Sequence, residues 1–186
     1  MSEEANGPGN TFTMSREAII DNLNALNAEL AAIDVKGEIA LVGGAVMCLV
    51  FKTRESTHDI DAIFEPKQLL YDCIKRVADK NNMPHNWIND SVKGFMSTEA
   101  DFVPHLELSN LCVMVASPEY LLAMKCLSSR VDHPTELSDI RALISHLGLE
   151  SYDEVEAVIL KYYPANRFHV KTKYVIKEIL GDVFDM

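Results

Sequence analysis

Apolar residues recur along the chain at two spacings, and these separate the expected helices from the expected strands. Over residues 15–33 they fall at every third or fourth position, as in an amphipathic helix, whereas over 58–64 they alternate with polar residues, as in a strand. The whole pattern predicts strands at 38–44, 58–64, 105–108 and 111–116, and helices at 15–33, 45–51, 119–130, 133–148, 152–163 and 171–180, with a further helix opening at Pro66.

Polar and proline residues mark several ends of these elements. Ser15 is placed to cap the first helix, and Ser117 followed by Pro118 opens another. Ser151 and Glu154 have the spacing of a capping box. These local signals support the boundaries that the apolar pattern predicts.

The order of the elements predicts an α/β (α+β) protein. Residues 15–116 are expected to form a small mixed β-sheet flanked by helices, and residues 117–186 a helical C-terminal region packed on it. Residues 1–14 are acidic and rich in Gly, Pro and Asn, so we expect a disordered lead-in there.

Composition and charge narrow the classes of function. The chain has 186 residues and a formal net charge of −11, which argues against binding to bulk DNA because that needs a basic surface; a locally basic nucleotide pocket remains compatible. No apolar run reaches the ~18–20 residues that cross a bilayer, so no membrane partner is expected. Four cysteines without CxxC spacing are typical of free thiols in a reducing cytoplasm, so the expected localisation is cytoplasmic: Cys48, Cys73, Cys112 and Cys126.

Two aspartates stand where an apolar strand is expected. Asp59 and Asp61 are two residues apart, so on a strand their carboxylates point the same way and repel each other. A divalent cation removes this repulsion, and hard oxygen ligands suit Mg²⁺. Alone, such a pair is more often an exposed strand edge.

A glycine pair precedes the aspartates. Gly43 and Gly44 follow a short buried strand and precede a helix, so backbone N–H groups at this turn could approach phosphate oxygens. Alone, a glycine pair is more often a tight turn. The two signals in this order favour a site for a metal ion and a nucleoside triphosphate (NTP).

These residues resemble the opening of the nucleotidyltransferase fold, the DNA polymerase β-like superfamily, whose signature is an hG[GS] turn followed by a Dh[DE]h strand. The matching segments are Val42-Gly43-Gly44 and Asp59-Ile60-Asp61-Ala62, with Arg54 and Thr57 placed as in bacterial members. Later segments are similar to small bacterial nucleotidyltransferases related to AbiEii-type toxins: 86–95, 115–130, 136–144 and 161–164.

The resemblance implies a glycine turn that holds the β- and γ-phosphates. It implies that Asp59 and Asp61 bind one or two Mg²⁺ or Mn²⁺ ions while a hydroxyl attacks the α-phosphorus and expels pyrophosphate. Active polymerases of this fold carry a third carboxylate on a later strand. Glu107 is the leading candidate, with Asp101 and Asp90 as alternatives, and Glu107 as a solvent-facing strand residue is equally compatible.

The resemblance also implies roles in the helical region. Lys125 interrupts an apolar helix and would serve as a phosphate clamp; the alternative is a lysine that reaches solvent at the rim. Asp139 would contact Lys125 or Arg130 or assist the site, and a surface salt bridge is the alternative.

The polar segment 86–95 offers further nucleotide-binding side chains. Trp87 could stack on a base, although a lone tryptophan near a loop is more often a core residue. Asn89 and Asp90 offer hydrogen-bonding groups, and Lys93 offers a cation.

Two functions remain open from the sequence. The first is a metal-dependent enzyme that transfers an NMP group to a hydroxyl of an RNA, protein or small molecule, in a setting related to toxin–antitoxin pairs. The alternative is a catalytically inactive nucleotide-binding or regulatory module. A homodimer or a cognate antitoxin is a further expected partner.

Overall fold

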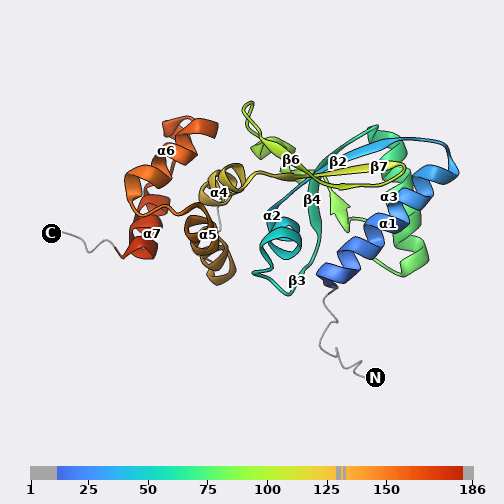
Figure 1. Cartoon of the computed structure of the whole chain (residues 1–186), viewed down its shortest axis with the longest axis horizontal. Helices are drawn as coiled ribbons and strands as arrows, with labels where there is room; N and C mark the ends of the chain where they lie inside the picture. Colours follow the sequence, from blue (N-terminus) through green and yellow to red (C-terminus); the bar gives the residue numbers. More distant parts are fainter. Residues whose placement is uncertain (1–11, 129–130, 132, 182–186) are drawn as a thin grey trace, which may run out of the picture.

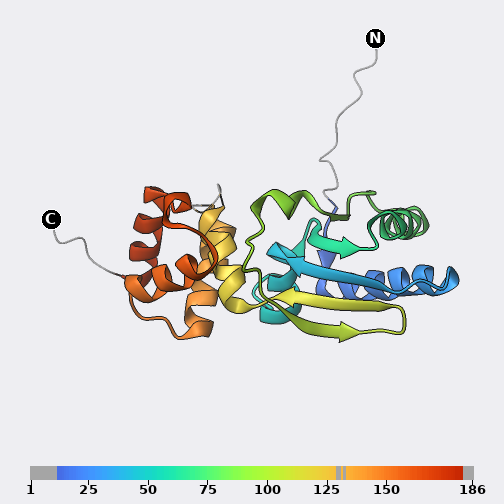
Figure 2. The same cartoon turned by 90° about the horizontal axis from the view of Figure 1, so that it is seen from above.

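The computed structural model describes residues 12–128, 131 and 133–181, and it confirms the mixed α/β fold class. Figure 1 shows a sheet with two long helices at one end of an elongated molecule and a cluster of helices at the other. Viewed from above in Figure 2, the C-terminal helices lie beyond the end of one central strand. None of the described helices is both long and apolar enough to cross a membrane.

The main sheet has five strands in the order β5-β4-β2-β7-β6. Strand β2 pairs antiparallel with β4 and parallel with β7, while β5 runs parallel to β4 and β6 antiparallel to β7. A separate two-stranded sheet joins β1 to β3. The strands are β1 (Met14–Ser15), β2 (Gly37–Val42), β3 (Ser56–Thr57), β4 (Ile60–Glu65), β5 (Ile88–Asn89), β6 (Phe102–Glu107) and β7 (Leu111–Ala116).

Seven α-helices are described, together with one π-helix and two 3₁₀ turns. The α-helices are α1 (Arg16–Ala32), α2 (Gly43–Val46), α3 (Lys67–Asn81), α4 (Pro118–Leu127), α5 (Pro134–Leu147), α6 (Tyr152–Tyr162) and α7 (Val170–Leu180). The π-helix Met47–Phe51 continues α2, and the 3₁₀ turns are Ser91–Phe95 and Ala165–Arg167.

The predicted caps form as local hydrogen bonds. The Ser15 side chain accepts from Ala18 N at the start of α1. The Ser151–Glu154 capping box at the start of α6 is complete in both directions. The sequence therefore contains enough local information to place these helix ends.

The two faces of the sheet are covered differently. Helices α1 and α3 pack against each other and lie on the face that carries fully buried residues such as Ile39, Leu41 and Ala62. On the opposite face, Asp61 and Ile63 of β4 are half-buried. The open face at the end of β2 and β7, next to α4, is where the candidate site lies.

Part of the predicted disordered lead-in, residues 12–14, belongs to the fold. Residues 1–11 lie outside the described part of the chain. Met14 belongs to β1, is 1% exposed and pairs with Thr57, and the Phe12 carbonyl lies 2.9 Å from His58 Nδ1. Residues 12–14 therefore join the fold, because one apolar side chain is buried beside β3.

Candidate active site

The glycine turn lies between β2 and α2. Gly43 has a φ of +68°, in the left-handed region that favours glycine. A Cβ on Gly44 would lie 2.9 Å from Arg54 Nη1 and 2.9 Å from Thr57 Oγ1. The backbone at Gly44 is therefore uncovered by a side chain, and any side chain added there would collide with Arg54 and Thr57.

Replacing Gly44 with Ala should therefore damage the site. The added methyl group must displace Arg54 or Thr57, so we expect a stability loss of about 1–3 kcal/mol and weaker NTP binding. Gly94→Ala is the matched control, because a Cβ there meets nothing within 4 Å. Equal melting temperatures and NTP affinities for the two variants would show that the close packing at Gly44 is unimportant.

The two aspartates lie beside this turn. Asp61 pairs in register with Val42, the residue just before the turn, and a Cβ on Gly43 would lie 3.1 Å from Asp61 Oδ2. Asp59 precedes β4, and its Oδ2 accepts a hydrogen bond from Asn89 Nδ2 at 3.0 Å. The carboxylates thus stand next to the bare backbone of the glycine turn.

The turn and the aspartates share one cavity of about 330 Å³ at the junction of the sheet with the helical region. Seven of the residues that the sequence singles out line it: Gly43, Gly44, Arg54, Thr57, Asp59, Asp61 and Lys125. The other walls come mainly from α4 and the two 3₁₀ turns, among them Leu121, Met124, Phe95 and Arg167, with Glu136 of α5 and Tyr163 at the end of α6. The cavity therefore has walls from both parts of the chain.

A network of four ionised side chains joins the two parts beside the cavity. Arg54 Nε donates to Asp139 Oδ1 at 3.1 Å, Arg54 also pairs with Asp139 Oδ2, and its Nη2 lies 3.1 Å from Glu136 Oε1. Lys125 Nζ lies 2.9 Å from Glu136 Oε2 and 2.7 Å from Asp139 Oδ2. The Lys125 and Asp139 side chains are 5% and 1% exposed, so this is a buried network. The expected contact between Asp139 and Lys125 is confirmed.

The network shifts the pKa of Glu136. Burial alone would raise this pKa, but the charges of Lys125 and then Arg54 outweigh burial and hold it below its ordinary value. For Arg54, burial alone would lower the pKa, and the contacts with Asp139 and Glu136 raise it instead. Both groups are therefore held in their charged forms.

The lowered pKa of Glu136 makes part of the stability depend on pH. A carboxyl whose pKa is lower in the folded state stabilises the fold above its unfolded value, near 4.5, and loses that contribution as the pH falls through the folded pKa. We expect Glu136→Gln to be less stable than wild type at pH 7, and this difference to shrink below pH ~4.5.

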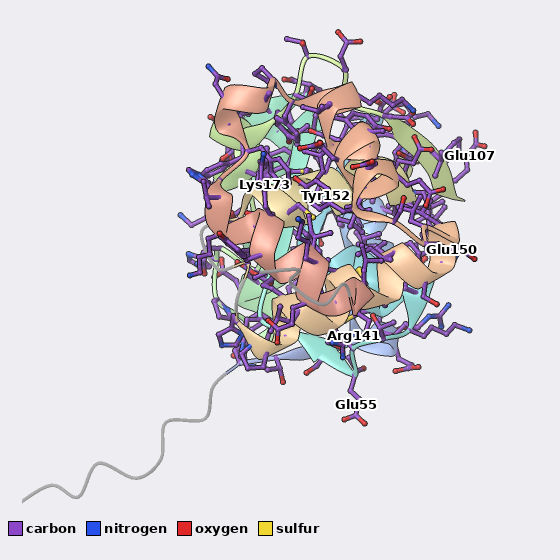
Figure 3. The ribbon with its side chains drawn as sticks, turned by 90° about the vertical axis from the view of Figure 1, so that its left-hand side faces the viewer. Glu55, Glu107, Arg141, Glu150, Tyr152 and Lys173 are labelled. Atoms are coloured by element: carbon purple, nitrogen blue, oxygen red, sulfur yellow. The ribbon has the colours of Figure 1, made fainter. Side chains whose placement is uncertain are left out.

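Urea unfolding at pH 7, 5, 4 and 3 would measure this difference. Glu55→Gln is the baseline, since Glu55 projects from the surface in Figure 3. A stability difference for Glu136→Gln that stays constant over this pH range would contradict the expectation.

Neither Glu107 nor Asp101, two of the candidates for a third catalytic carboxylate, lies in the cavity. Glu107 pairs with Cys112, which lies beside Glu38 at the end of the sheet remote from the glycine turn, and it points outward in Figure 3. The leading candidate is therefore wrong, because the β6–β7 hairpin carries Glu107 to the wrong end of the sheet. Asp101 is exposed and does not line the cavity.

Asp90, the other candidate for the third carboxylate, makes its contacts outside the cavity. It lies 2.8 Å from Lys67 Nζ and 3.3 Å from Lys93 Nζ and accepts a hydrogen bond from Tyr71, and these contacts hold its pKa well below the ordinary range. The neighbouring Asn89, the last residue of β5, donates to Asp59 instead, although it does not itself line the cavity. Neither Asp90 nor Lys93 lines the cavity.

Trp87 is a core residue, as the alternative interpretation held. It is 1% exposed, and its indole N–H donates to the carbonyl of Ile74 at 3.0 Å. Trp87 therefore cannot stack on a bound base. Arg130 lies outside the described residues.

The cavity residues to which the sequence assigned no role include Phe95, Glu136, Tyr163 and Arg167. Glu136 could have been found, because it is three residues before Asp139 on a helix and so shares its face. The other three are on segments whose approach to the cavity depends on how the helical region packs.

Residues 21–176 match a family model described as "Nucleotidyltransferase of unknown function (DUF6036)". Because this match covers most of the chain, the protein belongs to that nucleotidyltransferase family. The chain matches no curated protein and no solved structure. The relation to AbiEii-type toxins stays a prediction.

The donor set fits a magnesium-like cation that shares its coordination with a substrate. No cluster of three or more His, Cys, Asp or Glu side chains that could hold a metal is found in the described ranges. Two carboxylates next to a bare glycine turn nevertheless suit Mg²⁺, which takes one or two protein carboxylates and completes its shell with water and phosphate oxygens.

Proposed function

We propose that this protein is a metal-dependent nucleotidyltransferase that moves an NMP group from an NTP to a hydroxyl of an acceptor. The observation that carries the proposal is the meeting of the glycine turn with Asp59 and Asp61 in one cavity. The space beside Gly43 is bounded by Asp61 Oδ2, so a phosphate bound at the turn would lie next to a carboxylate. Two anionic groups this close require a cation between them.

The residues divide the work between phosphate binding and charge balance. The bare backbone at Gly43 and Gly44 would cradle the β- and γ-phosphates, while Asp59 and Asp61 would hold Mg²⁺ or Mn²⁺. The bound cation would neutralise charge that develops on the phosphates. The acceptor hydroxyl would attack the α-phosphorus and lose its proton to water, while the bond between the α-phosphorus and the oxygen that bridges to the β-phosphate breaks and pyrophosphate leaves.

Asn89 supports Asp59 in this arrangement. Its Nδ2 donates to Asp59 Oδ2 at 3.0 Å, and its own Oδ1 accepts from Ser91 N at 3.1 Å. The amide is thus fixed from both ends and leaves the other Asp59 oxygen to face a cation. Asn89 acts here as a positioning residue for the carboxylate.

A second candidate is a nucleotide-binding module that does not turn over. It is favoured by one observation: the residue paired with Asp61 on the neighbouring strand is Asn89, an amide that donates to Asp59, rather than a third carboxylate. A site with two carboxylates could still bind an NTP with one cation. The acceptor, whether RNA, protein or small molecule, and a role in a toxin–antitoxin pair belong to the first candidate.

Incubation with each α-labelled NTP in cell extract, with Mg²⁺, Mn²⁺ or EDTA, distinguishes the two. If the protein is a nucleotidyltransferase, the α-label should appear in RNA, protein or a small molecule when metal is present, and it should not appear with EDTA. Metal-dependent NTP binding without transfer in any extract would favour the module. Neither binding nor transfer would contradict both.

A further inference from the structure

The cavity has two chemically different walls. The wall from the sheet side is polar and carries Gly43, Gly44, Asp59 and Asp61, whereas the wall from α4 and the turn Ser91–Phe95 is largely apolar: Val92, Phe95, Leu121, Met124 and Leu127. A ligand that fills this space should have an anionic end and an apolar end. An NTP has both, with its base at the end remote from the phosphates.

Phe95 is the most exposed side chain of the apolar wall. It is 61% exposed, although large apolar side chains are usually covered. Its backbone is nevertheless held in place, because Tyr163 OH donates to the Phe95 carbonyl at 2.7 Å and Ser97 N donates to Tyr120 OH at 3.1 Å. The Phe95 ring is therefore attached to a backbone segment that hydrogen bonds hold in place.

Arg167 lies at the same wall. Its guanidinium carbon is 5.2 Å from the centre of the Tyr163 ring, so the cation rests on the tyrosine that also holds Phe95. Tyr163 is 3% exposed and thus serves as the buried support of both residues. A flat aromatic face and a flat cation are the two groups on which bases stack in proteins that bind single nucleotides or single strands.

We propose that Phe95 and Arg167 form the base subsite of this cavity, with the NTP base stacked on the Phe95 ring and Arg167 beside it. The proposal rests on the proposed function, because it assumes that the phosphates occupy the glycine turn. It assigns to Phe95 a binding role that Trp87 cannot fill.

Titration calorimetry of wild type and Phe95→Ala with two kinds of probe tests the proposal. The probes, both with Mg²⁺, are the four NTPs and inorganic tripolyphosphate, which has the phosphates but no base. Loss of one stacking partner should weaken the best NTP about tenfold and leave tripolyphosphate within twofold. Phe95→Trp should retain NTP affinity because it keeps an aromatic face.

Tyr174→Ala is the matched control, since Tyr174 is an aromatic residue that is 54% exposed and does not line the cavity. It should leave both affinities unchanged. Equal weakening of NTP and tripolyphosphate by Phe95→Ala would overturn the base subsite, as would unchanged NTP affinity; in the latter case the proposed function still stands. Failure of wild type to bind either probe would overturn the proposed function and the subsite together.

Discussion

Asp59→Asn and Asp61→Asn should each reduce nucleotidyl transfer by at least about 10³-fold. Each substitution keeps the size of the side chain and removes one of two carboxylates that would hold the cation, whose stabilisation of phosphate charge is worth several kcal/mol. The stability of the folded state should not decrease, because each substitution also removes repulsion between neighbouring carboxylates. Transfer of α-label and the melting temperature should be measured on the same samples.

Glu107→Gln is the matched control for this pair. It removes a carboxylate from the same sheet, at the end remote from the glycine turn, and should leave transfer unchanged. If Glu107→Gln abolished transfer while Asp61→Asn did not, the assignment of the site would be wrong.

Asp139→Asn should be strongly destabilising. Asp139 is 1% exposed and pairs with both Lys125 and Arg54, so the neutral amide leaves an excess positive charge in a buried network. Breaking a buried ion pair in this way costs about 3–5 kcal/mol, which for a protein of this size lowers the melting temperature by roughly 6–20 °C. Thermal unfolding followed by circular dichroism would measure the shift.

Two further variants test whether the lost ion pair causes the destabilisation expected for Asp139→Asn. Lys125→Met combined with Asp139→Asn removes one charge of each sign and should recover much of the lost stability, as a double-mutant cycle would show. Lys161→Gln breaks an exposed pair with Glu119 and should leave the melting temperature nearly unchanged. A melting temperature for Asp139→Asn as close to wild type as that of Lys161→Gln would contradict the account.

The elements that the sequence predicted well depend on local chemistry. The α1 cap at Ser15 and the α6 capping box need only residues within one turn, so the sequence contains the whole interaction. The facing of Asp61 likewise needs only alternation along β4, whereas Asp59, expected on the same strand, lies just before it. Their nearness to Gly43 was expected from the order of the glycine pair and the aspartates along the chain and from the resemblance.

The residues that were misplaced depend on pairing between distant segments. Alternation gives the face of Glu107 but not the end of the sheet at which the β6–β7 hairpin turns. Likewise, nothing local shows that β5 places Asn89 beside Asp59 and sends Asp90 to Lys67. The contact of Lys125 with Asp139 was among the expectations, whereas its contact with Glu136 follows only from the packing of α5 on α4.

The most direct test of the central claim is a crystal structure of the protein with Mn²⁺ and an NTP analogue that cannot be cleaved between the α- and β-phosphates. The account predicts an anomalous Mn²⁺ peak bound by Asp59 and Asp61, with the triphosphate on the backbone of Gly43 and Gly44. A nucleotide bound elsewhere, or Mn²⁺ bound away from both aspartates, would contradict it.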